Sequence, residues 1–158
     1  HTTQLFGEAG YATVLGPIAA EPFAGLAYVD AGSGAFSEQG GAAALTGAGG
    51  SLAETYSSLG VRLAPEDDGD SARIVTPRAS VSWEHAFGRL TPAEIVTFEA
   101  TGETFQTLGV TLDRDAANIQ LGLDVRVAPS GLLSFGYQGV QSGRAHDNAL
   151  RAQFNWNF

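Results

Sequence analysis

The chain has 158 residues and a formal net charge of −9, which allows a single domain with a sizeable core and argues against nucleic acid as a partner. It has no cysteine, which excludes disulfides, thiolate metal sites and cysteine nucleophiles. No apolar run approaches the ~20 residues that a membrane-spanning helix needs. The sequence begins at His1 without a signal peptide, so we expect a processed product or a piece of a longer protein.

Seven segments alternate apolar and polar residues, the pattern of strands with one apolar and one polar face. In chain order they cover residues 3–15, 18–30, 53–64, 73–88, 113–127, 131–141 and 147–158. The alternation is clearest over 118–127, where every second residue is Ile, Leu or Val. It is weakest in the first two segments, because Phe6 and Phe23 fall among the polar residues. No segment predicts a helix.

The connections between these segments alternate in length. The short turns are Gly16-Pro17, 65–71 and 128–131, and the long connections are 30–52 and 89–112. Short turns at one rim and long loops at the other are the plan of an outer-membrane barrel, and strands of about ten residues match its span. The loop 89–112 has an alternation of its own, which predicts a hairpin. We therefore expect an all-β, antiparallel up-and-down transmembrane β-barrel, although a soluble sandwich would show the same alternation.

Five short motifs follow one another along the chain: FGEAGY, EPFAGLAYV, GGAAAL, SWEHAFG and the terminal FNWNF. In this order and spacing they resemble the C-terminal translocator domain of monomeric (type V) autotransporters of Gram-negative bacteria, over nearly the whole chain. The resemblance implies a 12-stranded barrel with an N-terminal helix in its lumen, which carries a passenger domain to the cell surface. It also implies a C-terminal assembly signal made of aromatic residues, here Phe154, Trp156 and Phe158.

Counted back from its last residue, the chain would hold about seven C-terminal strands of such a barrel. Residues 1–158 would then form one domain, with the first strands, the lumen helix and the passenger outside the chain. Seven is an odd number, whereas bacterial single-chain barrels have even numbers of strands. Two other accounts stay open: a truncated copy, or a shortened relative that closes through bulges or by oligomerising.

Charged residues on the polar faces of the predicted strands are the main candidates for functional side chains. They are Glu8, Glu21, Arg62, Arg78, Glu84, Asp124, Arg126 and Arg151. A water-filled lumen can hold such charges, whereas the lipid face of a barrel penalises them by ~2–4 kcal/mol near the midplane. They predict a hydrophilic conduit that contacts an inner helix or an unfolded passenger. The alternative is that the Arg and Glu side chains pair across strands and serve the structure alone.

Other motifs give weaker signals for chemistry. Glu84 and His85 suggest acid–base catalysis, but alternation places them on opposite faces, so we expect His85 to be an interfacial residue near a strand end. The PEDDGDS stretch (65–71) is rich in carboxylates but lacks the ligand spacing of a calcium loop, and it fits a periplasmic turn better. The glycine-rich stretches lack the residues of a phosphate loop, and the histidines lack metal-ligand spacing. We predict neither an enzyme nor a cofactor.

The sequence therefore predicts an outer-membrane translocator domain that permits export and surface display of an N-terminal passenger. Its partners would be outer-membrane lipid, the barrel-assembly machinery and its own passenger. The long loops would lie outside the cell and the C-terminus in the periplasm. Two alternatives stay open: a porin- or adhesin-type outer-membrane barrel whose external loops bind a ligand, and a secreted, soluble β-sandwich binding module.

Overall fold

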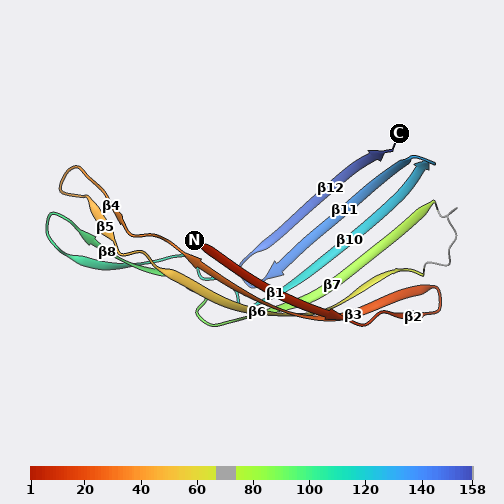
Figure 1. Ribbon diagram of the computed structural model, residues 1–158, viewed down its shortest axis with the longest axis horizontal. Coiled ribbons are helices and arrows are strands. Elements are labelled where there is room, and N and C mark those ends of the chain that lie inside the picture. Colours follow the sequence, from red (N-terminus) through yellow and green to blue (C-terminus); the bar gives the residue numbers. More distant parts are fainter. Residues whose placement is uncertain (67–73, 158) are drawn as a thin grey trace. The chain divides into compact units, whose positions relative to one another are not determined.

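The computed structural model describes residues 1–66 and 74–157, and within these residues the regular secondary structure is entirely β (Figure 1). An eight-stranded sheet has the order β1-β3-β6-β7-β10-β11-β12, with the short β2 paired to β3. Its strands are β1 (Thr2–Gly10), β2 (Thr13–Leu15), β3 (Ile18–Gly32), β6 (Ser51–Pro65), β7 (Val75–Phe87), β10 (Asp115–Ala128), β11 (Gly131–Ser142) and β12 (His146–Trp156). Sequence neighbours therefore pair in space, as the up-and-down prediction requires.

Six of the seven predicted segments each correspond to one strand of this sheet, within a few residues at either end. The predicted segment 3–15 is instead divided into β1 and β2. Tyr11 donates its N–H to the carbonyl of Pro22, and Thr13 pairs with Ala20, so the register continues across the break. Proline has no N–H to return to Tyr11, which interrupts the ladder at this rung without shifting it.

A second, four-stranded sheet is built from the two long connections. Its strands are β4 (Phe36–Ser37), β5 (Leu45–Gly47), β8 (Ala93–Phe98) and β9 (Thr104–Leu108), in the order β4-β5-β8-β9. The hairpin expected over 89–112 is confirmed as β8 and β9. The sequence did not predict β4 and β5, which pair with that hairpin through β8.

The chain divides into two compact units, and each is considered by itself. The hairpin unit comprises residues 1–6, 26–56 and 86–114, and the sheet unit comprises 7–25, 57–85 and 115–158. In the hairpin unit, Val96 is buried and the rings of Phe98 and Phe105 lie 5.2 Å apart. Gly88 follows β7 directly with a φ of 102°, a left-handed conformation that glycine adopts without strain. Arg114 donates to the carbonyls of Ala86 and Gly88, which fixes this end of β7.

The described residues contain almost no apolar core. The buried apolar side chains among them are Ala20, Ala44, Ala86 and Val96. Many large apolar side chains are exposed instead, including Leu150 at 86% and Phe154 at 56%. A soluble sandwich would bury such side chains between two facing sheets, so this distribution favours an apolar environment outside the protein. No helix in the described part of the chain is long and apolar enough to cross a membrane.

Candidate functional site

The two faces of the eight-stranded sheet differ sharply in the sheet unit. Leu121 of β10 lies opposite Ala79 of β7 and Tyr137 of β11, and Tyr137 lies opposite Leu150 of β12. Strands β7, β10, β11 and β12 run side by side (Figure 1), so this row crosses all four. The exposed fractions of Leu121 and Leu150 are 50% and 86%, so the row is open to its surroundings among the described residues. The face is therefore a continuous apolar surface, which we call the apolar face.

The apolar face has the height of a thin bilayer. On β10 it extends from Ile119 to Val127, which corresponds to about 27 Å along a strand. Tilted by ~40°, as in membrane barrels, this becomes about 21 Å, close to their apolar band of ~25 Å. Aromatic residues lie near both ends of the band, with Trp83 opposite Ala117 and Trp156 opposite Gly131. Such aromatic residues are typical of the two interfaces of a membrane protein.

The opposite face of the sheet, which we call the charged face, carries a hub centred on Arg62 of β6. Its Nη2 atom donates to both carboxylate oxygens of Glu8 on β1, at 2.7 and 2.8 Å. Its Nη1 atom donates to Glu21 on β3 at 3.0 Å. The guanidinium carbon also lies 3.9 Å from the ring centroid of Phe23. One arginine thus links three neighbouring strands by bonds that are stronger than neutral ones.

A second ion pair lies further along the charged face. Arg78 of β7 contacts Asp124 of β10 at 3.2 Å. Across the rung of Arg78 lie Gly122 and Gly136, and then Arg151 of β12. The two glycines leave space between the arginines, because a Cβ added to either would meet no atom closer than 3.6 Å. The rung therefore forms a shallow depression with a cation at each end.

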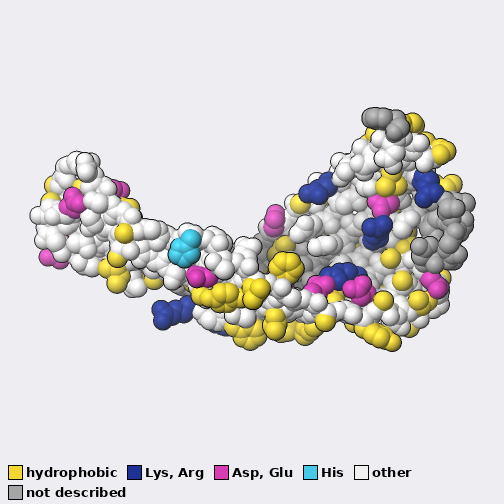
Figure 2. All heavy atoms as spheres, in the orientation of Figure 1, with side chains coloured by type: hydrophobic (Ala, Val, Ile, Leu, Met, Phe, Trp, Pro, Cys, Tyr) yellow, Lys and Arg dark blue, Asp and Glu magenta, His cyan; other side chains and the backbone are white. Residues whose placement is uncertain are grey.

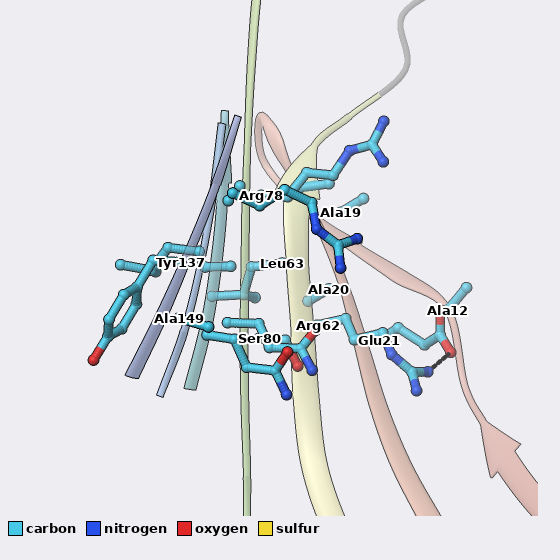
Figure 3. A pocket seen from close by; sticks show the side chains of 18 of the residues that line it. Ala12, Ala19, Ala20, Glu21, Arg62, Leu63, Arg78, Ser80, Tyr137 and Ala149 are labelled. Carbon is cyan, nitrogen blue, oxygen red and sulfur yellow. Dashed lines mark hydrogen bonds and ion pairs between the residues drawn. The ribbon is translucent and has the colours of Figure 1, made fainter. Parts of the chain in front are cut away.

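A hollow of about 840 Å³ lies on the charged face. Among its lining residues are Glu21, Arg62, Arg78, Ser80, Gln120 and Arg151. Figure 3 shows Glu21, Arg62 and Arg78 on one side of the strands, whereas the ring of Tyr137 points to the other side. In the space-filling view, arginine and carboxylate side chains gather in this hollow (Figure 2). The sheet therefore presents a water-compatible surface opposite its apolar one.

The eight charged residues singled out in the sequence have different surroundings. Glu8, Glu21 and Arg62 form the hub, Arg78 and Asp124 form the second pair, and Arg151 lines the hollow. The pairing of Arg with acidic residues across strands is thus present. Glu84 lies opposite Ala116, and Arg126, two residues after Asp124 on β10, lies opposite Leu132.

His85 has an acidic partner that the sequence did not reveal. Its Nδ1 atom lies 2.7 Å from Asp115 Oδ1, and Trp83 Nε1 donates to the same oxygen at 3.1 Å. Glu84 pairs with Ala116 and His85 with Asp115, so the expected separation of Glu84 from His85 on opposite faces is confirmed. Alternation could not identify Asp115, because the contact depends on the register of two strands that are distant in sequence.

The remaining candidates are placed as follows. Phe154 lies opposite Leu133, and its ring centroid is 6.0 Å from that of Trp156. Phe158 lies outside the described residues, as do residues 67–71 of the acidic stretch 65–71. Within the described ranges, no three His, Asp or Glu side chains are grouped as metal ligands.

An antiparallel sheet with an exposed apolar face and a charged face is the pattern of outer-membrane β-barrel proteins. The family model described as "Autotransporter beta-domain" matches residues 1–138, and the chain belongs to this family. Two relatives, both named "Extracellular serine protease" from Serratia marcescens, are 38% and 36% identical over 157 residues. The alignments cover 99% of this chain but only 15% of each relative.

The chain is thus the translocator β-domain of an autotransporter, a component of type V secretion. This confirms the family, the all-β fold class and the function expected from the sequence. It also sets aside the soluble sandwich and the plain porin or adhesin barrel. Membership of the family implies the outer membrane as the location, and association with a membrane and a passenger.

Proposed function

We propose that the charged face lines the conduit used by the passenger and that the apolar face contacts outer-membrane lipid. The observation that carries this proposal is the segregation of the faces, with Arg62 and Arg78 on one side and Leu121 and Leu150 on the other. Charge on a lipid face is costly, whereas a hydrated lumen accommodates it. Residues 30–52 and 89–112 would lie outside the cell, and the short turns and the C-terminus in the periplasm.

We also propose that this chain itself catalyses no covalent step and that any enzyme activity belongs to the passenger. The two Serratia marcescens relatives, named extracellular serine proteases, support a serine-protease passenger. For assembly we propose that Phe154, Trp156 and Phe158 are read by the barrel-assembly machinery. The exposure of Phe154 and Trp156 on the apolar face supports their accessibility to a partner.

The proposal that the charged face lines the conduit can be tested with substitutions that add large side chains to that face. A Cβ added to Gly122 or Gly136 would make only ordinary contacts and both glycines line the hollow, so Gly122→Trp and Gly136→Trp would place a large ring there. In the full-length protein in Gram-negative cells, we expect normal amounts of folded domain in the membrane but slower exposure of the passenger to external protease. The control is Leu121→Trp, on the opposite face of the same strand. Equal passenger exposure in all three variants would contradict a conduit at the charged face.

The assembly signal needs a separate experiment. Deletion of Phe158 in the full-length protein should lower the amount of domain recovered in the outer membrane. Replacement of Gln153, a neighbouring polar residue of β12, by alanine should leave that amount unchanged. Normal recovery and display without Phe158 would count against this part of the proposal.

A further inference from the structure

Apolar matching alone cannot fix the register of β1. This strand has one neighbour in the described sheet, β3, and all of its residues are exposed. A slip of one residue would move its apolar side chains to the wrong face, but a slip of two would return each of them to the same face. The apolar pattern therefore tolerates two-residue slips. The Gly16-Pro17 turn fixes the register of β2, but β1 is separated from β2 by the break at residues 11 and 12, so a contact made by β1 itself can select its register.

Arg62 supplies a contact that depends on the register. Its bond to Glu21 and its position over Phe23 hold the guanidinium on β3 and β6, so that Nη2 faces β1. In the observed register, Nη2 meets both oxygens of Glu8. A two-residue slip would move Glu8 by about 7 Å along the strand, beyond hydrogen-bond distance. It would also separate the guanidinium of Arg62 from the carboxylate of Glu8.

Gly10 adds a steric condition at the same place. A Cβ added to Gly10 would lie 2.5 Å from Glu21 Oε1, so the carboxylate that orients Arg62 occupies the space above this glycine. In either slipped register, Glu8 or Ala12 would replace Gly10 at that rung, and both have a Cβ. The observed register is therefore the one that satisfies Arg62 and leaves room for Glu21.

We propose that Arg62, oriented by Glu21 and Phe23, selects the register of β1 through Glu8 and Gly10. The consequence is functional, because the position of β1 sets how the next strand can align with its free edge, and the stagger of strands determines whether a barrel closes. The inference extends the proposed function but rests on the sheet alone, not on passenger export.

The 158 residues contain no cysteine, so a cysteine pair introduced into this domain has no competing thiol within it, and disulfide cross-linking can test the register. The Tyr11–Pro22 hydrogen bond places Ala9 opposite Ala24, so the double variant A9C/A24C reports the observed register. The double variants Y11C/A24C and G7C/A24C report two-residue slips in the two directions. All three are made in the full-length protein and oxidised in isolated outer membranes. In the parent background, the A9C/A24C cross-link should dominate.

Arg62→Ala should shift the ratio of native to slipped cross-links by roughly tenfold, as expected for the loss of a charge-assisted hydrogen bond. Arg78→Ala is the matched control, because its partner Asp124 lies on β10, a strand that is paired on both sides. Glu8→Gln removes one charge at the edge and should act in the same direction as Arg62→Ala. If Arg62→Ala does not insert into the membrane, Glu8→Gln decides the question.

An unchanged ratio in the inserted variants would overturn the proposal. Passenger exposure is measured on the same cells. A shifted ratio with normal exposure would support register selection by Arg62 independently of export. Loss of exposure with an unchanged ratio would reject register selection while leaving the conduit proposal standing.

Discussion

The ring of Phe23 on β3 occupies the space above Gly60 on β6. A Cβ added to Gly60 would lie 2.5 Å from Cζ of that ring and 2.6 Å from the carbonyl oxygen of Val81. The guanidinium of Arg62 lies near the same ring. A glycine is therefore required at this rung by both an aromatic side chain and the backbone of the neighbouring strand.

Gly60→Ala should consequently destabilise the domain. The added methyl group would force the ring and the β7 backbone to move, a type of overpacking that costs about 1–3 kcal/mol. Urea unfolding of the domain in lipid vesicles measures the effect. Gly122→Ala is the control, because the added Cβ would lie 3.6 Å from its nearest neighbour, an ordinary contact. Similar unfolding midpoints for the two variants would show that Phe23 does not need this glycine.

Phe23 also shows how far the sequence could predict the charged face. The alternation correctly assigned Phe23 to the polar face. An aromatic residue on that face made the prediction of this strand weaker. The structure explains its position by the glycine opposite it, but the identity of that glycine depends on the register of β3 with β6. The identities of the three partners of Arg62 likewise depend on the strand register. A period of two assigns residues to faces, whereas contacts between strands require a register that turns and long-range pairing determine.

The segregation of the faces predicts opposite outcomes for two neighbouring residues of β10. Leu121→Arg would place a charge on the apolar face and should cost ~2–4 kcal/mol if that face contacts lipid. Gln120→Arg would place the same charge in the hollow and should have little effect on folding. The fraction of folded domain in lipid vesicles checks both variants. An equal loss in the two would argue against a lipid-facing apolar face.

Glu54 is the buried charged residue of the hairpin unit, with an exposed fraction of 3%. Neither of its carboxylate oxygens has a hydrogen-bond partner among the described residues. Burying an unpaired carboxylate costs several kcal/mol, so Glu54→Gln should leave stability unchanged or raise it. Glu21→Gln should lower stability instead, since it weakens the bond to Arg62. Urea unfolding compares the two variants, and a loss with Glu54→Gln would reveal a partner for this carboxylate.

The second sheet marks the limit of prediction from alternation. The hairpin over 89–112 was predicted because β8 and β9 are long enough to show a period. Strands β4 and β5 span two and three residues in a glycine-rich connection, which is too short for a pattern. They exist because β5 pairs with β8, with Leu45 opposite Phe98 and Gly47 opposite Val96. Long-range pairing of this kind leaves no local signal in the sequence.

The burial of Val96 predicts that this side chain stabilises the second sheet. It is 5% exposed, whereas its neighbour Ile95 on the other face of β8 is 58% exposed. Val96→Ala would remove buried methyl groups and should cost about 1–2 kcal/mol, whereas Ile95→Ala should cost much less. Because the hairpin unit has few other buried apolar side chains, Val96→Ala should accelerate protease cleavage between Glu99 and Glu103 on intact cells. Equal cleavage rates for the two variants would show that burial of Val96 does not hold this sheet together.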